Sequence, residues 1–212
     1  MKALIIGASG ATGKDLMEVL LNDPGYTEVL AFVRRPGGMA HSKLKEITTD
    51  FDKLDEVSDH IKGDVLFSCL GTTLKVAGSK VKQYHIDYEI PLKFAEIARR
   101  NGVPATVLLS AYGASVKSMV FYSKVKGELE EAIGRLAFVK YIIFRPGMLL
   151  RKGTDRAGER VGTMILNVLN SLGLIRKFRP LPTSTLAEKM AKAARVLPDG
   201  KHVIELDKIF GF

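Results

Sequence analysis

The sequence predicts an α/β fold in which a doubly wound parallel sheet of about seven strands is covered by helices on both faces. Short, continuously apolar segments alternate with longer amphipathic ones, as strands buried on both faces alternate with covering helices. The first apolar segment also runs directly into a turn with three glycines and then into an amphipathic helix. The strands are expected at residues 2–6, 28–33, 45–49, 64–68, 105–110, 139–144 and 202–206. The helices are expected at residues 11–22, 52–60, 81–101, 118–134, 159–172 and 184–197, the last of them capped by Thr183 or Ser184 after Pro182.

The length and composition indicate one domain. The chain has 212 residues, of which 46% are hydrophobic, and this fits a single globular unit over residues 1–212. The segment 151–180 breaks the alternation, because glycines and basic residues precede an apolar helix there. We predict that it is a small C-terminal insertion that caps the substrate, with Arg156 and Arg160 as candidates for contacting an anionic group.

The three glycines of the first turn are spaced Gly-x-x-Gly-x-x-Gly between residues 7 and 13. One glycine lets the chain turn sharply, one lets the backbone approach a pyrophosphate, and one lets the helix pack closely on the strand. The pyrophosphate would bind the N–H groups at the start of the helix, which carry the positive end of its dipole. The pattern therefore predicts a Rossmann-type dinucleotide site. The predicted contacts are Gly7, Ser9, Gly10, Ala11, Thr12 and Gly13.

The ends of the second and third strands bear on which dinucleotide is bound. NAD sites usually place an acidic residue at the end of the second strand, where it binds the ribose 2′-hydroxyl, but here Arg34 and Arg35 stand there. A guanidinium binds a 2′-phosphate through charge-assisted hydrogen bonds, so NADP(H) is favoured over NAD(H). The alternative is that the two arginines form only an exposed basic turn. Asp50 and Phe51, after the third strand, would meet the adenine edge, unless Asp50 only caps the next helix.

The fourth predicted strand ends in the small residues Cys69-Leu70-Gly71-Thr72. At the carboxyl end of a central strand, small residues let the backbone pass close to a cofactor. We therefore expect these four residues to contact the dinucleotide. No base can be paired with Cys69 from the sequence, so its side chain is interpreted as a small packing residue and not as a nucleophile.

The residues expected to carry chemistry follow the fifth strand, which ends at Ser110. Tyr122 and Lys126 are four residues apart on the next predicted helix and share one of its faces. A lysine ammonium and an oxidised nicotinamide, both positive, would lower the pKa of the tyrosine. Such a tyrosine can pass a proton to or from a carbonyl or hydroxyl while hydride moves at the nicotinamide, and Ser110 would hydrogen-bond the same substrate oxygen. The alternative is a Tyr–Lys pair on the helix surface.

Several stretches of the chain carry a resemblance to a known family. They are GASGATG (7–13), DF (50–51), FSCLGTT (67–73), ID (86–87), LLSAYGA (108–114), FYSKVKGELE (121–130) and FRPGMLL (144–150). The chain resembles the short-chain dehydrogenase/reductase superfamily, and within it the atypical NAD(P)-binding group of NmrA-like and Tat-interacting, oxidoreductase-like proteins. The resemblance implies a Rossmann core, NADP(H) binding and a triad of Ser110, Tyr122 and Lys126. It also implies that Arg145-Pro146-Gly147-Met148 presents backbone to the nicotinamide carboxamide.

Two departures from the family pattern bear on catalysis. Many members have a second serine after the fifth strand, where this chain has Ala111, and catalytic relatives often have asparagine where this chain has His85-Ile86-Asp87. His85 is interpreted either as an acid in the pocket or as a polar surface residue. The expected function is an NADP(H)-dependent oxidoreductase acting on a small carbonyl or alcohol. The alternative is a non-catalytic NADP(H)-binding redox sensor or scaffold that acts through a protein partner. An epimerase or dehydratase is disfavoured, because few residues follow Gly147 to form a sugar-nucleotide lobe.

The composition also limits the partners and the location. The expected partner is a small-molecule substrate. The net charge of +9 favours anionic ligands and is therefore compatible with an anionic substrate. No helix concentrates the basic residues among aromatic ones, so nucleic acid is not expected. No cluster has metal-ligand spacing and no apolar run approaches a membrane span, so neither metal nor membrane is expected. We expect a monomer or homodimer, and a cytoplasmic location because Cys69 is the single cysteine and no signal peptide fits the start.

Overall fold

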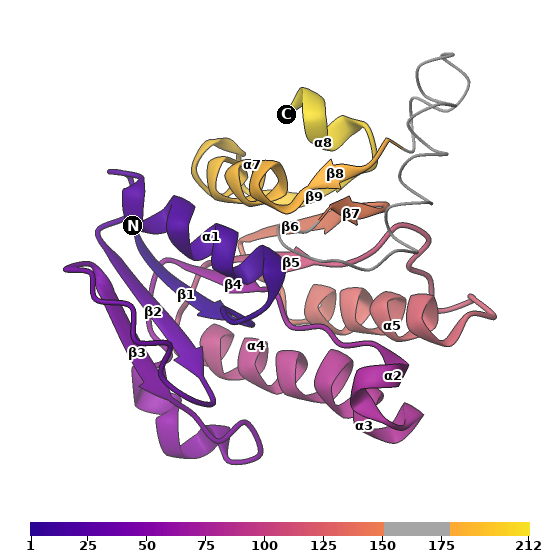
Figure 1. The fold of residues 1–212 in the computed structure, drawn as a ribbon, viewed down its shortest axis with the longest axis horizontal. Helices are drawn as coiled ribbons and strands as arrows, with labels where there is room; N and C mark the ends of the chain where they lie inside the picture. Colours follow the sequence, from indigo (N-terminus) through magenta and orange to yellow (C-terminus); the bar gives the residue numbers. More distant parts are fainter. Residues whose placement is uncertain (151–178) are drawn as a thin grey trace.

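The computed structural model describes residues 1–150 and 179–212, and its centre is one sheet of seven parallel strands (Figure 1). The strands are β1 (Lys2–Ile6), β2 (Glu28–Val33), β3 (Leu44–Thr48), β4 (Val65–Ser68), β5 (Ala105–Leu109), β6 (Lys140–Arg145) and β9 (Gly200–Glu205). Their order is β3-β2-β1-β4-β5-β6-β9, so the winding direction reverses between β1 and β4. In sheets of this type a ligand binds outside the carboxyl ends of the strands at that point of reversal. All seven predicted strands are confirmed; β1 and β2 have the predicted ends, and the ends of the other five differ by at most two residues.

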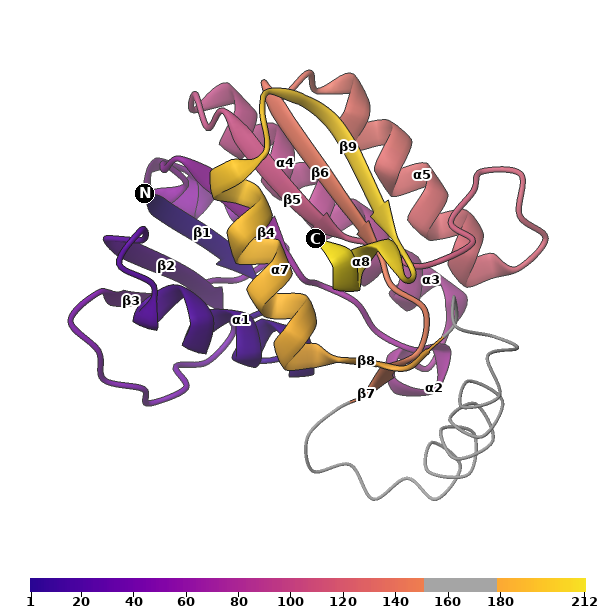
Figure 2. The same ribbon diagram turned by 90° about the horizontal axis from the view of Figure 1, so that it is seen from above.

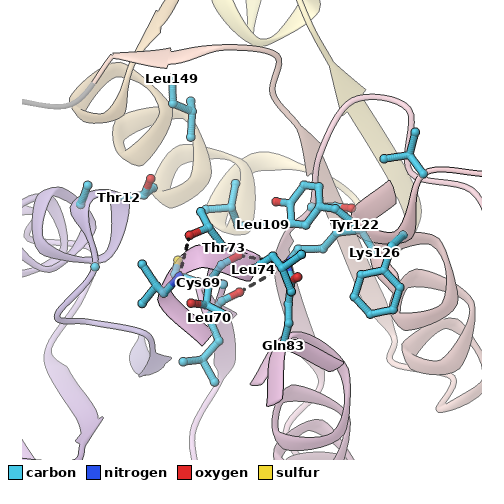
Figure 3. A pocket seen from close by; sticks show the side chains of 18 of the residues that line it. Thr12, Cys69, Leu70, Thr73, Leu74, Gln83, Leu109, Tyr122, Lys126 and Leu149 are labelled. Carbon is cyan, nitrogen blue, oxygen red and sulfur yellow. Dashed lines mark hydrogen bonds between the residues drawn. The ribbon is translucent and has the colours of Figure 1, made fainter. Parts of the chain in front are cut away.

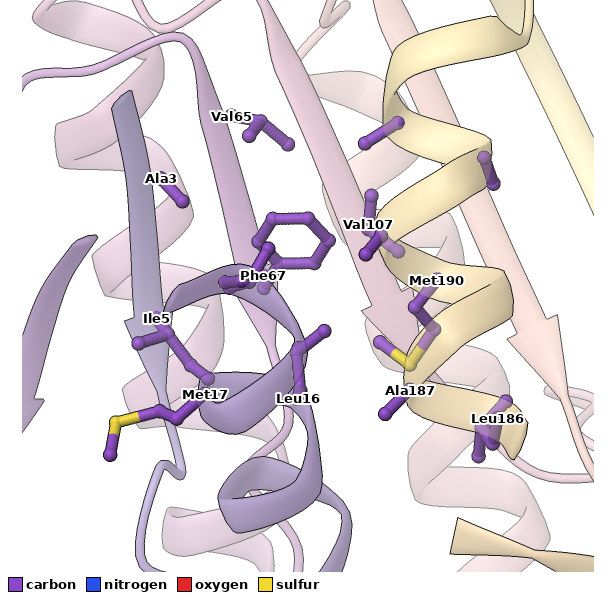
Figure 4. Packing of buried hydrophobic residues seen from close by; sticks show 14 of the residues in the cluster. Ala3, Ile5, Leu16, Met17, Val65, Phe67, Val107, Leu186, Ala187 and Met190 are labelled. Atoms are coloured by element: carbon purple, nitrogen blue, oxygen red, sulfur yellow. The ribbon is translucent and has the colours of Figure 1, made fainter. Parts of the chain in front are cut away.

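Helices cover both faces of the sheet. On one face, α1 (Ala11–Asn22) packs beside α7 (Thr183–Val196), and on the other lie α4 (Ile90–Arg100) and α5 (Phe121–Arg135) (Figures 1 and 2). Figure 4 shows the first of these layers, where Leu16 of α1 and Met190 of α7 meet Phe67 of the sheet. Residues of one strand serve both layers in alternation: Ile5 packs under α1, whereas Leu4 and Ile6 belong to the opposite cluster. This explains why the central strands are continuously apolar.

The long helix expected at 81–101 forms as three consecutive pieces. These are α3 (Lys80–Tyr84), a π-helical turn η2 (His85–Glu89) and α4. The N–H of Ile90 bonds the carbonyl of His85, five residues earlier, and Pro91 has no N–H to continue the usual pattern. The local widening is therefore explained by the proline, which the helical periodicity alone does not reveal.

Other elements differ from the expectation in smaller ways. The helix expected at 52–60 is a 3₁₀ helix, η1 (Leu54–His60), and α5 begins at Phe121. Neither Thr183 nor Ser184 caps α7: the cap position is Pro182, and the hydroxyl of Thr183 instead donates to the carbonyl of Leu150 at 3.3 Å. The short elements α2 (Leu74–Ala77), β7 (Leu149–Leu150), β8 (Leu181–Pro182) and α8 (Lys208–Gly211) were not expected. The predicted helix 159–172 and the two candidate arginines, Arg156 and Arg160, lie outside the described residues, as does nearly all of the predicted insertion 151–180.

Candidate functional site

A cavity of about 670 Å³ opens at the carboxyl edge of the sheet, beside the point where the winding reverses (Figure 3). Its walls come from the glycine turn, the end of β4, the end of β5 and the start of α5. Ten of the residues predicted for the site line it: Gly10, Ala11, Thr12, Cys69, Leu70, Gly71, Thr72, Ser110, Tyr122 and Lys126. The cavity therefore joins the predicted dinucleotide residues to the predicted chemical residues.

Gly7 and Gly13 of the first turn have the turn and packing roles that the sequence predicted for two of its three glycines. Gly7 has a φ of +81°, and a Cβ on it would lie 2.5 Å from the backbone carbon of Cys69. A Cβ on Gly13 would lie 2.1 Å from the carbonyl oxygen of Gly7. Gly7 thus allows the turn and the close approach of β4, and Gly13 allows α1 to pack on the end of β1. Any larger residue at these two positions would force the backbone apart.

The start of α1 is suited to an anion. Its cap residue, Gly10, has no side chain that accepts a hydrogen bond, and the first turn holds no acidic residue. The N–H groups of the first helical residues have no acceptor within the helix. They lie beside the cavity at Ala11 and Thr12, where the helix dipole is positive. A dinucleotide pyrophosphate fits this arrangement, because it would supply the missing acceptors and the negative charge.

Tyr122 and Lys126 lie one turn apart on α5, and both side chains line the cavity (Figure 3). Lys126 is only 2% exposed, and its Nζ donates to the carbonyl of Leu70 at 3.2 Å. Burial lowers the pKa of Lys126, and the nearby carboxylate of Asp87 acts in the opposite direction. The lysine is therefore fixed in place, with its ammonium directed to the loop after β4.

Asp87 is an acidic residue near Lys126 to which the sequence analysis assigned no role in the site. It is fully buried in the π-helical turn, and it accepts a hydrogen bond from the N–H of Thr72 at 2.7 Å and another from Gln83 at 3.3 Å. Burial raises the pKa of Asp87, whereas Lys126 lowers it. Asp87 thus holds the loop after β4 in the position where its backbone borders the cavity. The sequence signal that could have indicated a role for Asp87 is its position in the Ile86-Asp87 stretch, one of those that carry the family resemblance.

Ser110 lies in the cavity wall, but its hydroxyl donates to the buried carboxylate of Glu130, one turn beyond Lys126 on α5. Arg145 binds the same carboxylate with two hydrogen bonds, at 3.0 and 2.6 Å, and lies 3.5 Å from Glu205. The hydroxyl proton of Ser110 is therefore engaged inside the protein. The predicted contact between Ser110 and a substrate oxygen stays a prediction. In this arrangement the Ser110 Oγ has lone pairs that can accept a hydrogen bond, but its proton is already donated to Glu130.

Cys69 is not an activated thiol. Burial raises its pKa to about 12, although Lys126 acts to lower it. A thiol with this pKa is not ionised near neutral pH, so it is a poor nucleophile. Its side chain packs against the apolar cluster beneath α1 and α7, as the sequence analysis interpreted it.

The remaining predicted residues lie away from the cavity lining. Arg34 and Arg35 are exposed just after β2, next to β1 and its glycine turn. Asp50 accepts a hydrogen bond from the N–H of Asp52 at 3.1 Å, which is the local turn role, and Phe51 packs against the cluster under α4. Pro146, Gly147 and Met148 follow β6; the carbonyls of Pro146 and Met148 accept from Tyr112 and Leu181.

His85 is a surface residue that bridges two carboxylates. Its Nδ1 lies 2.6 Å from Glu89, and its Nε2 lies 2.7 Å from Asp52. These hydrogen bonds raise the pKa of His85. The residue does not line the cavity, so the interpretation as an acid in the pocket is not supported.

In the described residues, no three His, Cys, Asp or Glu side chains gather as metal ligands do, and no helix is long and apolar enough to cross a membrane.

Sequence comparisons place this geometry in a family. The family model described as NAD(P)H-binding matches residues 7–165. The chain belongs to this NAD(P)H-binding family. It is 34% identical over 195 residues to the protein FMP52, mitochondrial, of Candida albicans, an alignment that covers 89% of this chain and 85% of that protein. It is 38% identical over 162 residues to the protein HTATIP2 of Rattus norvegicus, covering 74% of this chain and 65% of that protein. The predicted resemblance is thereby confirmed.

Solved structures confirm the fold. The UDP-glucose 4-epimerase of Thermus thermophilus in complex with NAD has a TM-score of 0.72 at 19% identity and matches 97% of this chain and 77% of its own. The oxidoreductase ylbE of Lactococcus lactis has a TM-score of 0.60 at 19% identity, with 86% and 90% covered. At these identities the likeness concerns the fold alone. One expectation is wrong: the FMP52 relatives of several fungi are named mitochondrial, which contradicts the predicted cytoplasmic location.

Proposed function

We propose that the protein is an NADP(H)-dependent oxidoreductase of the short-chain dehydrogenase/reductase type that acts on a small carbonyl or alcohol. The observation that carries the proposal is the shared cavity: Tyr122 and Lys126 line it together with the anion-binding start of α1. The residue proposed to exchange a proton and the residues proposed to hold the dinucleotide therefore border one cavity. Membership of an NAD(P)H-binding family supports the dinucleotide, and the two arginines after β2 support the 2′-phosphate.

The chain's own residues have separable tasks in this reaction. The glycine turn and α1 bind the pyrophosphate, and the loop from Cys69 to Thr72, held by Asp87, forms the neighbouring wall. When bound, the nicotinamide supplies or accepts the hydride. Tyr122 donates its phenolic proton to the substrate oxygen during reduction and accepts it back during oxidation. The positive charge of Lys126, fixed on Leu70 and one turn away, favours the phenolate form of Tyr122.

The test is a panel of carbonyl compounds followed by the absorbance of NADPH, with wild type, Tyr122→Phe and Tyr88→Phe compared. Tyr122→Phe keeps the ring but removes the proton, so turnover should fall by about two to four orders of magnitude. Tyr88, which stacks on Tyr84 at 4.8 Å between ring centroids and does not line the cavity, is the matched control. Wild-type turnover by Tyr122→Phe on a reactive substrate would show that another group moves the proton.

The second candidate is an NADP(H)-binding redox sensor or scaffold that acts through a protein partner. Ala111 and the engaged hydroxyl of Ser110 favour it, since neither of these two positions then offers a free hydroxyl proton to a substrate oxygen. Tight NADPH binding with no oxidation of NADPH across the carbonyl panel would support the sensor over the enzyme. The substrate is proposed to be a small molecule, and the protein a monomer or homodimer; sedimentation of the purified chain tests the latter.

A further inference from the structure

Two segments border the mouth of the cavity and together form a rim, which we define as residues 74–82 and 117–120. Leu74, Val76 and Lys80 of the first segment and Val120 of the second line the same cavity. The Nζ of Lys80 lies 5.5 Å from the ring centroid of Phe121, directly after the second segment. Both views of the fold show α2, α3 and the start of α5 at one end of the molecule (Figures 1 and 2). The rim is therefore one continuous edge of the surface.

The rim exposes an unusual amount of apolar surface. Of the twelve large apolar side chains exposed in the described residues, five belong to it. Met119 is 99% exposed, Val81 80%, Val76 71%, Val120 62% and Leu74 47%. Single exposed apolar residues are ordinary, but a group of them on one edge marks a contact surface. Because Val81 and Met119 do not line the cavity, a small substrate inside it does not account for their exposure.

The same rim is basic and carries no acidic residue. Lys75, Lys80, Lys82 and Lys117 lie in it, whereas the 23 acidic residues of the chain all lie elsewhere. Within the part of the chain that the structure describes, none of these four lysines forms an ion pair. Elsewhere on the surface several lysines are paired, as Lys2 is with Glu28 at 3.1 Å. The rim therefore combines unpaired positive charge with exposed aliphatic groups.

We propose that the rim docks on the surface of an anionic phospholipid bilayer, with the mouth of the cavity facing the lipid. Aliphatic side chains enter the boundary between headgroups and acyl chains, and lysines around them bind the anionic headgroups. A folded protein partner fits less well, since lysine is depleted from the cores of protein interfaces, where aromatic residues and arginine are enriched. The proposed contact is peripheral and needs no spanning segment, and it differs from the sequence-based expectation of no membrane. It does not depend on whether the site turns over a substrate.

The experiment is co-sedimentation of the full chain with two kinds of vesicle, pure phosphatidylcholine and phosphatidylcholine in which about a third is replaced by phosphatidylserine. We expect binding to the anionic vesicles only, and binding that weakens as salt is added. Lys75→Glu with Lys82→Glu should weaken partitioning by at least roughly tenfold, because each basic residue near the surface contributes roughly fivefold. Lys45→Glu with Lys201→Glu changes the net charge equally at two exposed positions outside the rim and is the control.

A second pair of variants tests the apolar part. Val81→Ser with Met119→Ser should weaken binding to anionic vesicles several-fold, whereas Val196→Ser with Val203→Ser, also exposed, should not. NADPH titration and thermal unfolding verify that every variant is folded, since none of the substituted residues lines the cavity. Absence of wild-type binding to anionic vesicles would overturn the proposal and favour a protein partner. Equal losses in rim and control variants would also overturn it, because attraction by the overall charge of +9 would then explain the binding.

Discussion

Ser110, at the carboxyl end of β5, donates its hydroxyl proton to the buried carboxylate of Glu130 on α5. Glu130 is 4% exposed, and the guanidinium of Arg145 binds both of its oxygens. The hydroxyl of Tyr141 also donates to the backbone carbonyl of Glu130, at 3.0 Å. The end of β5 is thus joined to α5 and β6 by a buried polar network directly behind the cavity wall. Buried networks of this kind are costly to leave half-satisfied.

The first prediction follows from this network and separates two roles for Ser110. Ser110→Ala should lower the free energy of unfolding by about 1–2 kcal/mol, because one acceptor of a buried carboxylate loses a partner. Glu130→Gln should cost more, about 3 kcal/mol, since Arg145 would lose the carboxylate that it binds with two hydrogen bonds and keep only Glu205, at 3.5 Å, as a charged partner. Chemical denaturation measures both. If Ser110→Ala is as stable as wild type but loses most of its turnover, the hydroxyl acts on the substrate and not on the network.

Cofactor preference is predicted from the exposed arginines after β2. Arg34→Ala with Arg35→Ala should weaken NADPH binding by about ten- to a hundredfold, the equivalent of losing one charge-assisted contact of about 1.5–3 kcal/mol. NADH binding should change little, because it has no 2′-phosphate. Calorimetric titration of both cofactors gives the comparison, with Arg100→Ala and Arg135→Ala, two exposed arginines on α4 and α5, as the control. Equal affinity of wild type for NADPH and NADH would contradict the prediction.

Two glycines in helices should respond to alanine in opposite directions. Gly13→Ala places a Cβ 2.1 Å from the carbonyl oxygen of Gly7, so α1 must move off β1. We expect a loss of about 2 kcal/mol or more in unfolding free energy, together with weakened NADPH binding. At Gly134 the nearest atom to a new Cβ is 3.8 Å away, so Gly134→Ala should stabilise α5 by about 0.5–1 kcal/mol. Thermal unfolding of both variants tests the pair, and a harmless Gly13→Ala would argue against the tight turn.

The sheet and most of the cavity lining could be predicted from the sequence because their signals are local. A parallel strand buried on both faces is a continuous apolar run, and the glycine turn stands at fixed spacing after one. The partners of Ser110 and Lys126 could not be predicted, since Glu130 and Asp87 are brought to them by packing between separate elements. Sequence spacing indicates which residues share a helix face, but not which side chain of another element accepts a hydrogen bond.

His85 provides a prediction about pH that is independent of catalysis. Its hydrogen bonds to Glu89 and Asp52 raise its pKa above the usual 6.5 in the folded protein. A raised pKa means that folding favours the protonated form, so the stabilisation is fully present below pH 6.5 and is lost as pH rises through the folded-state pKa. His85→Gln should therefore destabilise the protein at about pH 6 and have little effect at about pH 9.

Two measurements test this assignment of His85. Proton NMR should find the imidazole of His85 titrating above 6.5, and Asp52→Asn, which removes one of its two carboxylates, should lower that midpoint. Chemical denaturation at both pH values should give a cost for His85→Gln only on the acidic side. NADPH affinity should be the same in wild type and His85→Gln, because the imidazole lies on the surface and not in the cavity. A titration midpoint at or below 6.5, or an equal cost at both pH values, would mean that the carboxylates do not hold the charged imidazole in solution.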